Sequence, residues 1–258
     1  MPSDTLNHSR YIFPFFSGTY FVYRKIDVLR LVSIAKCISS TPKYLDVGCG
    51  NCDFLDKIRF YLPNAIGIEL DTTIFFLLYK TKPSYVQSIP IECFNPPGLI
   101  DVSFVGWMEK GIDFRKFVSK ISRCIVTTFD TGGQCGINGN CEYDEFGLKK
   151  VASWRTPSWI DVNIELMNKY YTKDITDERI ESLLNLKTSS NLWCVYSQTG
   201  LSETIKESLK IHFEKEKKEY HNEKYDFESI LDELGFRYLC KLDSIISPDK
   251  RLWDINFY

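Results

Sequence analysis

The chain has 258 residues, of which 44% are hydrophobic and 26% are charged, and its 34 acidic and 32 basic side chains give a net charge of −2. This length exceeds that of a typical domain but is short for two, and the hydrophobic fraction is that of a globular protein with a sizeable core. The slightly acidic balance argues against a dedicated binder of duplex nucleic acid, because such proteins concentrate Lys and Arg against phosphate.

The nine Cys residues fall at irregular spacings and form no Cys/His pattern typical of a zinc site. Several lie in apolar runs, where a reduced Cys behaves as a small hydrophobic residue. We therefore expect a reduced, cytoplasmic protein without a metal site. The apolar stretch 11–38 is interrupted by Arg24, Lys25, Asp27 and Arg30, so we expect no membrane span, and the N-terminal residues lack the layout of a signal peptide.

Strands and helices alternate in the first half of the chain. Apolar residues at helical spacing predict helices, and short apolar runs bounded by turn residues predict strands. Helices are predicted over 21–38, 51–62, 72–82 and 112–121, and strands over 43–46, 65–71, 84–89, 99–107 and 123–130. This order indicates βαβ units and a parallel sheet, and the continuous apolar strands fit a sheet buried on both faces.

The second half is less regular. In chain order we expect a long loop at 131–147 and an aromatic-rich section without a clear assignment at 148–200. A charged helix at 201–224 and a second helix at 225–236 follow, and the chain ends with two strands at 237–245 and 251–258. The charged helix carries an apolar residue every fourth position from Leu201 to Phe213, and its Lys and Glu residues are expected to face solvent. The last two strands flank a turn and can form an antiparallel hairpin.

The segment Tyr44–Leu55 (YLDVGCGNCDFL) combines a strand, a glycine loop and the start of a helix. Gly48 and Gly50 permit positive φ and a close approach of the backbone to a ligand, while the helix N-terminus offers unpaired N–H donors. The second strand then carries Glu69, and an acid about 20 residues past such a loop binds ribose hydroxyls in dinucleotide folds. Loop, strand and acid thus occur in the order of a nucleoside-binding site.

With these motifs the sequence resembles the class I S-adenosylmethionine-dependent methyltransferase family. DVGCGNCDFL resembles its motif I, AIGIELD its motif II, LIDVSFVGWME its motif IV strand, and the C-terminal helix and strands its closing hairpin. The resemblance implies an α/β fold with a Rossmann-like, seven-stranded, mostly parallel sheet and a C-terminal antiparallel hairpin. The implied division is an N-terminal helical cap (1–42), a cofactor-binding core (43–130 with 225–258) and an acceptor-binding lid inserted between strand five and the last helix (131–224).

The resemblance also implies roles for individual residues in binding S-adenosylmethionine. Asp46 is expected near the cofactor amino group, the glycine loop beneath its methionine and ribose, Glu69 at the ribose hydroxyls and Leu70 beside adenine. The full expected set is Asp46, Gly48, Cys49, Gly50, Glu69, Leu70, Ser88, Ile89, Gly106 and Trp107. Two positions depart from the family pattern: Ser88 stands where an acid is common, and Cys52 where a third Gly is usual. Asp53, at the sixth position of the glycine motif, disfavours a nicotinamide cofactor.

The sulfonium of the cofactor already makes the methyl group electrophilic, so the protein must mainly align acceptor and methyl group. A hydroxyl acceptor also needs a base, and the candidates are Glu109 after strand four and Asp130 after strand five. We expect methyl transfer to an O or N atom, or a C atom, of a small molecule, bound by aromatic residues of the insertion and the N-terminal extension. The aromatic candidates in the insertion are Trp154, Trp159, Tyr170, Tyr171, Trp193 and Tyr196.

Two alternatives stay open. The first is a methyltransferase acting on tRNA or an RNA cap, for which a local basic patch could be formed by Lys149, Lys150, Arg155, Lys169 and Lys173. Nucleic acid is not the favoured partner, given the overall charge. The second is a non-catalytic module of methyltransferase fold that binds a partner protein, which the departures at Cys52 and Ser88 keep open. The sequence specifies no oligomeric state.

Overall fold

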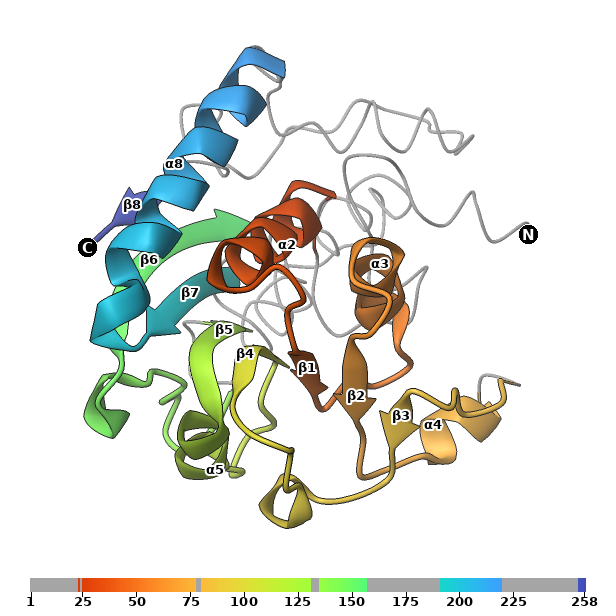
Figure 1. Cartoon of the computed structure of the whole chain (residues 1–258). Helices are drawn as coiled ribbons and strands as arrows, with labels where there is room; N and C mark the ends of the chain where they lie inside the picture. The colour runs from red at the N-terminus through yellow and green to blue at the C-terminus, as the bar shows by residue number, and fades with distance from the viewer. Residues whose placement is uncertain (1–22, 24, 78–79, 131–134, 157–190, 220–254) are drawn as a thin grey trace, which may run out of the picture.

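The computed structural model describes residues 23, 25–77, 80–130, 135–156, 191–219 and 255–258. A single sheet runs through this part of the chain, and helices cover it (Figure 1). The strands are β1 (Tyr44–Val47), β2 (Ile66–Ile68), β3 (Val86–Gln87), β4 (Ile100–Gly106), β5 (Ser122–Asp130), β6 (Lys149–Thr156), β7 (Asn191–Ser197) and β8 (Asn256–Phe257). The helices are α2 (Lys25–Ile38), α3 (Asp53–Tyr61), α4 (Thr73–Leu77), α5 (Arg115–Ile121) and α8 (Ser202–Glu219), with short 3₁₀ turns η2 (Ile91–Cys93), η3 (Asp144–Phe146) and η4 (Thr199–Leu201).

The strand order is β3-β2-β1-β4-β5-β7-β6-β8. Strands β1 to β5 are parallel, whereas β7, β6 and β8 pair antiparallel. The chain first builds outward from β1 to β3 and then returns to place β4 on the other side of β1. This reversal is the topological switch point of a Rossmann-like fold, where ligands bind beyond the carboxyl ends of the strands. The predicted α/β, Rossmann-like, mostly parallel sheet is therefore confirmed. The predicted count of seven strands is corrected, because β8 adds an eighth strand beside β6 in the described part of the chain.

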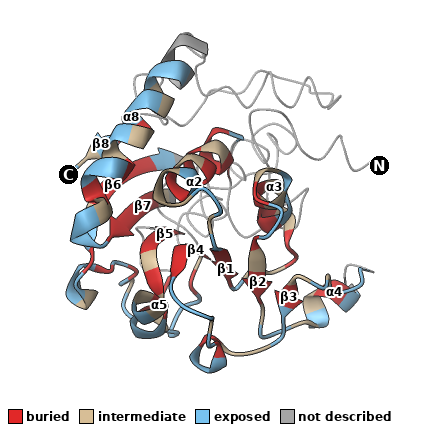
Figure 2. Ribbon diagram, in the orientation of Figure 1, coloured by how far each residue is buried: buried red, intermediate tan, exposed pale blue. Residues whose placement is uncertain are grey.

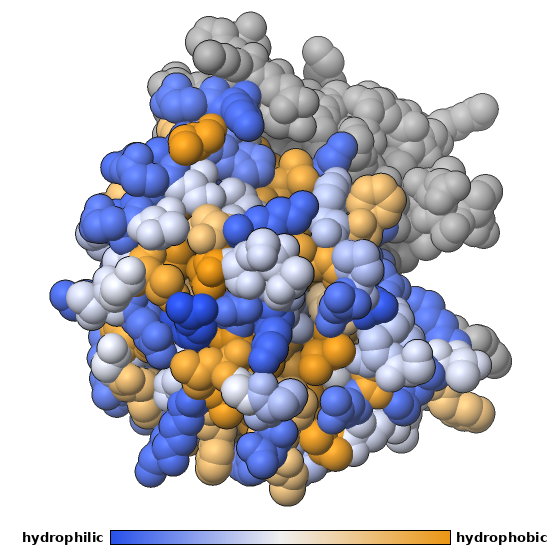
Figure 3. Space-filling model, in the orientation of Figure 1, coloured by the Kyte–Doolittle hydropathy of each residue, from blue (hydrophilic) through white to orange (hydrophobic). Residues whose placement is uncertain are grey.

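Two apolar layers cover the sheet. On one face α2, α3 and α8 bury residues such as Leu31, Leu55 and Leu209 against the strands. On the other face η2 and α5 contribute Ile91 and Val118. Figure 2 shows the central strands buried and the outer side of α8 exposed, as the predicted one-sided apolar pattern of that helix requires. In the view of Figure 3, apolar residues on the described surface lie in patches interspersed with charged ones.

The position of the antiparallel pair corrects one part of the sequence prediction. The expected hairpin strand at 237–245 and residues 251–254 of the next lie outside the described residues. Within the described residues 255–258, β8 (Asn256–Phe257) pairs with β6. The antiparallel strands next to β5 are instead β6 and β7, which fall within the expected lid insertion 131–224. They join the sheet because their central residues are buried on both faces and all but Ser153 are apolar, as in a strand of the core.

Aromatic residues expected to line an acceptor pocket also belong to this core. Trp154 and Trp193 are fully buried and stacked with ring centroids 5.8 Å apart, and Phe104 stacks on Trp193 at 5.6 Å. The indole N–H of Trp154 donates a 2.9 Å hydrogen bond to Asp27 of α2, which ties that helix to β6. Tyr196 is buried on the other face. The remaining candidates of the insertion, Trp159, Tyr170 and Tyr171, lie outside the described residues, as do those of the N-terminal extension before residue 23.

Candidate functional site

A pocket of about 450 Å³ opens beyond the carboxyl ends of β1, β2 and β4. This is the position that the switch point of the sheet predicts for a ligand. Eight of the residues proposed from the sequence line it, namely Gly48, Gly50, Glu69, Leu70, Ile89, Gly106, Trp107 and Glu109. These residues come from four separate loops. The tertiary structure therefore brings together residues as far apart in the sequence as Gly48 and Glu109.

The glycine loop is fixed by backbone hydrogen bonds to the end of β2. The N–H groups of Gly48 and Cys49 both donate to the carbonyl of Ile68, at 2.9 and 3.0 Å. Gly48 has φ of +69°, and a Cβ placed on it would meet no atom within 4 Å. The backbone conformation therefore favours glycine there, and the space beside it is open to the pocket.

Glu69 closes the loop from the other side. Its Oε2 accepts a 2.7 Å hydrogen bond from the Gly50 N–H, and its Oε1 accepts a 3.0 Å bond from the Asp71 N–H. Burial raises the pKa of Glu69, while these two backbone donors act in the opposite direction. The carboxylate thus holds the loop in place and lines the pocket at once, which is the arrangement expected of a residue that receives ribose hydroxyls.

Asp46 lies beneath the loop, only 2% exposed, and does not line the pocket wall. Its pKa is raised well above the ordinary value because the carboxyl group is buried and because Glu69 is close. Asp53, at the start of α3, accepts a 2.6 Å hydrogen bond from the Tyr23 hydroxyl, and burial raises its pKa too. Three carboxyl groups therefore surround the glycine loop, and a cation nearby would stabilise their ionised forms.

The opposite wall follows β4. Trp107 has φ of +61°, a conformation that is rare for a bulky side chain, and its N–H donates a 2.9 Å hydrogen bond to the carbonyl of Thr128. Strained backbone of this kind is concentrated at functional sites. Glu109 is exposed at the pocket mouth, where a carboxylate could reach an acceptor.

Four predicted residues stand apart from the pocket lining. Asp46 and Cys49 lie behind it, Ser88 is exposed outside it, and Asp130 ends β5 with a side chain outside the described set. Sequence reasoning missed several lining residues, among them Ile74, Glu92, Ile112 and Phe114. Only their position in the sequence could have identified them, because each follows a predicted strand by a few residues.

A feature of the loop that the sequence prediction overlooked is its pair of thiols. Cys49-Gly50-Asn51-Cys52 is a Cys-x-x-Cys segment, and the two sulfur atoms lie 3.8 Å apart. Cys49 is half-buried, whereas Cys52 is buried and caps α3 with φ of +67°. The third Gly of the family motif is thus replaced by a residue in a glycine-like conformation.

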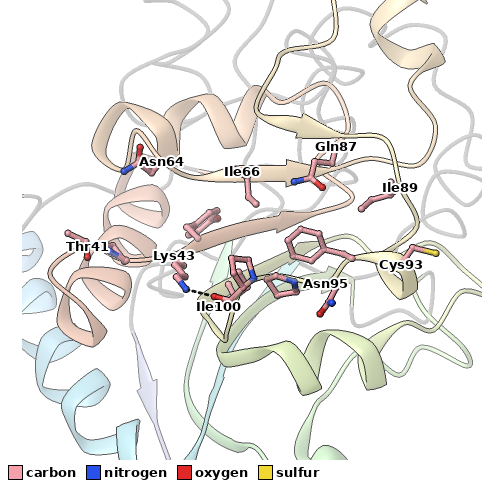
Figure 4. Close-up of a pocket in the computed structure, with 14 residues that line it drawn as sticks. Thr41, Lys43, Asn64, Ile66, Gln87, Ile89, Cys93, Asn95 and Ile100 are labelled. Carbon is pink, nitrogen blue, oxygen red and sulfur yellow. Dashed lines mark hydrogen bonds between the residues drawn. The ribbon is translucent and has the colours of Figure 1, made fainter.

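A second cavity of about 570 Å³ lies at the other end of β1 and β2, and Ile89 lines both cavities. Figure 4 labels five polar side chains of its lining beside the apolar Ile66 and Ile100, namely Thr41, Lys43, Asn64, Gln87 and Asn95. The Lys43 ammonium donates a 2.8 Å hydrogen bond to the Pro97 carbonyl in the turn at 95–98. No other residue proposed from the sequence lies in this cavity.

Further properties of the described part of the chain bear on the predictions. Among these residues, no group of three or more His, Cys, Asp or Glu side chains is placed to hold a metal ion. No helix among them has the length and apolar character needed to span a bilayer. Of the expected basic patch, Lys150 pairs with Glu142 at 3.1 Å, while Lys169 and Lys173 fall outside the described residues.

Comparison with family models and with curated proteins gives no match. Among solved structures, the chain is similar to geranyl diphosphate methyltransferase in complex with S-adenosylmethionine (13% identity, 68% of this chain and 86% of the other, TM-score 0.46). It is similar to the N-methyltransferase NodS from Bradyrhizobium japonicum WM9 in complex with S-adenosylhomocysteine (12%, 68% and 85%, 0.42) and to the plantazolicin methyltransferase BpumL (12%, 67% and 82%, 0.40). Identities and TM-scores at this level assign no function to the chain.

Proposed function

We propose that this protein is a class I methyltransferase that binds S-adenosylmethionine in the pocket beyond β1, β2 and β4 and transfers its methyl group to a small molecule. The observation that carries this proposal is the arrangement at the topological switch point. A glycine loop with positive φ is held by Glu69, whose carboxylate also lines the pocket. Such a loop and acid accommodate the ribose of a nucleoside.

The adenine half of the cofactor fits the apolar side of the pocket. Leu70 is 70% exposed and Ile112 44% exposed, and both line the pocket. Large apolar side chains exposed in a concave site are typical of surfaces that a ligand covers. Ile89 and Ile91 extend the same wall. Ser88 lies outside the pocket, so we propose that Glu92, which lines it, is the acid near the adenine.

The charge of the site favours S-adenosylmethionine over a dinucleotide. Asp46, Asp53, Glu69 and Asp71 lie in and around the glycine loop, so a pyrophosphate would meet carboxylates of like charge. S-adenosylmethionine carries a sulfonium and an ammonium group against one carboxylate, and its net positive charge complements these residues. S-adenosylhomocysteine has lost the sulfonium charge, so its electrostatic attraction to these carboxylates is weaker.

The cofactor supplies the electrophilic methyl group, and the chain must orient the acceptor and exclude water. We propose Glu109 as the residue that orients or deprotonates the acceptor, because it is exposed at the mouth of the pocket. We propose Asp130 as the alternative residue for this role.

The residues of 1–42 and of 131–224 outside the sheet are proposed to cover the acceptor. The free thiols of the described cysteines support the proposal of a cytoplasmic location.

The first test is calorimetric titration of the purified protein with S-adenosylmethionine, S-adenosylhomocysteine and NAD⁺. We expect micromolar binding of the first two and none of the third. Glu69→Ala should weaken binding by tenfold or more, since one or two charge-assisted hydrogen bonds contribute about 1.5–3 kcal/mol each. Glu203→Ala is the matched control, because this glutamate lies on α8 and pairs with Lys206 away from the pocket.

Equal cofactor affinity in Glu69→Ala and the wild type would contradict the assignment of this pocket. No binding of either cofactor by a folded protein would favour the alternative of a partner-binding module. If both bind, a screen of small amines, phenols and carboxylates identifies the acceptor, and a strongly salt-dependent competition by tRNA would instead favour the RNA alternative.

A further inference from the structure

The two thiols of the glycine loop are placed to react with one another. Cys49 and Cys52 have their sulfur atoms 3.8 Å apart, and the Cys52 N–H donates a 2.9 Å hydrogen bond to the Cys49 carbonyl. A hydrogen-bonded turn of four residues brings its first and last Cα atoms within about 7 Å. This range overlaps the Cα separations of about 4.4–6.8 Å that disulfides span.

The surroundings keep space for the Cys49 sulfur. A Cβ on Gly67 of β2 would lie 2.7 Å from this sulfur and 3.1 Å from the Cys49 Cβ. Because Gly67 has no side chain, the thiol can occupy the gap between the loop and β2. A disulfide has a sulfur–sulfur distance of roughly 2 Å. The two sulfur atoms would therefore have to approach by about 1.8 Å, which a local rearrangement of the turn can supply.

We propose that Cys49 and Cys52 form a reversible disulfide bond that lowers the affinity of the pocket for S-adenosylmethionine. The step is thiol–disulfide exchange with a low-molecular-weight disulfide such as oxidised glutathione. One thiolate attacks it and releases one glutathione, and the second Cys thiolate then displaces the other. The protein loses two protons and two electrons, and the oxidised glutathione is reduced to two molecules of glutathione.

The expected effect on binding comes from the residues between the two sulfur atoms. Gly50 lines the pocket and donates to Glu69 at 2.7 Å, so contraction of the turn shifts the donor that holds the proposed ribose-binding carboxylate. This consequence rests on the proposed function, whereas formation of the disulfide does not. A hydrogen bond from the partner thiol, burial and the charges of Asp46 and Glu69 raise the pKa of Cys49. Its thiolate is therefore scarce at neutral pH, and alkaline buffer speeds the exchange.

The chain allows the bond to be assigned directly. Trypsin cleaves after Lys43 and Lys57, and the resulting peptide 44–57 contains Cys49 and Cys52 and no other Cys. The protein is incubated in mixtures of reduced and oxidised glutathione, alkylated and digested without reduction. We expect this peptide to lose two hydrogen atoms and both alkylation sites, and to regain them on reduction. Exposed Cys93, on its own peptide, serves as the internal control for unselective oxidation.

The same samples are titrated with S-adenosylmethionine. We expect roughly tenfold weaker binding after oxidation, a coupling of usual size between two events in one protein, and recovery on reduction. Cys52→Ser and Cys49→Ser should each lose the difference between oxidised and reduced samples, whereas Cys93→Ser should keep it. Because coupling is reciprocal, saturating S-adenosylhomocysteine should also protect peptide 44–57 from oxidation in the wild type, which requires no variant.

Each outcome has a distinct meaning. A dithiol peptide 44–57 under conditions that modify Cys93 overturns the disulfide. A disulfide with unchanged cofactor affinity, or without protection by S-adenosylhomocysteine, overturns its effect on binding. Absence of cofactor binding in the fully reduced protein overturns the proposed function itself, and with it the regulation, while the peptide still reports whether the bond forms.

Discussion

Asp46 shows how one buried residue sets a conflict between stability and binding. Its carboxyl group is 2% exposed, and burial together with Glu69 raises its pKa well above the ordinary value. In the folded protein it therefore holds its proton at pH values where the unfolded chain has released it. Folding stability falls as the pH rises from the ordinary carboxyl pKa of about 3.9 through the raised pKa. The ionised form at higher pH is the one that would attract the cationic cofactor proposed above.

Asp46→Asn should stabilise the protein near neutral pH and weaken its binding of S-adenosylmethionine. The removed charge is unfavourable in the folded state, so we expect a rise in Tm of roughly 2–4 °C, which corresponds to about 1 kcal/mol in a domain of this size. The gain should vanish in acid below the ordinary carboxyl pKa. Thermal unfolding across pH measures it, with Asp144→Asn, an exposed carboxylate on η3, as control. A Tm of the variant below that of the wild type at neutral pH would show that the Asp46 carboxyl group does not destabilise the fold.

At the scale of elements, the contact between the glycine loop and β2 depends on a missing side chain. A Cβ at Gly67 would lie 2.7 Å from both the Cys49 sulfur and the Leu55 Cδ2 atom. Leu55 is fully buried on α3, so loop, strand and helix meet at this glycine. The third Gly of the motif usually serves such close helix–strand packing; here Cys52 stands in its place and Gly67 on the strand contributes the space.

Gly67→Ala should destabilise the fold by about 1–3 kcal/mol, the usual cost of extra volume in a packed core. Denaturant unfolding measures this, and Gly200→Ala is the matched control because its added Cβ would meet no atom within 4 Å. The double variant Gly67→Ala with Cys49→Ala should recover part of the loss, since it removes one of the two clashing groups. A stability equal to that of the wild type would show that the loop tolerates displacement.

At the scale of the whole molecule, Arg115, which follows Phe114 of the pocket wall, is bonded to the loop that contains Glu142 and Glu145. It is 5% exposed and binds Asp113 at 2.8 Å, the Glu142 carbonyl at 2.7 Å and Glu145 at 2.7 Å. The loop that it holds pairs through Gly136 with the backbone of residues 108 and 111, next to the pocket. The segment expected to be a long loop is thus ordered, in its described part, by a cation from α5.

Arg115→Met should lower the free energy of unfolding by about 1–3 kcal/mol, because carbonyl and carboxylate partners lose a charged donor. It should also weaken cofactor binding, since the 108–111 segment loses support. Unfolding in denaturant and titration with S-adenosylmethionine measure both effects, and Lys116→Met, an exposed neighbour on the same helix, is the control. Unchanged cofactor affinity in the destabilised variant would show that loop and pocket are independent.

The sequence by itself determined the parallel half of the sheet and one wall of the pocket. The strand ending in Asp46, the loop through Gly50 and the acid Glu69 are adjacent in local patterns, so hydrophobic periodicity and spacing were sufficient to predict them. Only the tertiary structure decided which later strands complete the sheet. The pairing of β7 with β5 joins residues 61 to 73 positions apart, from Asp130 with Asn191 to Cys124 with Ser197, and depends on burial that the chain acquires on folding.

The same reason applies to the site. Burial and the approach of Glu69 set the pKa of Asp46, Gly67 makes room for the Cys49 sulfur, and the loop after β4 brings Ile112 to the pocket. Each property arises between segments that the sequence keeps apart. The sequence therefore predicted where the pocket lies in the fold, while the three-dimensional packing decided its charge, its second wall and the proximity of its two thiols.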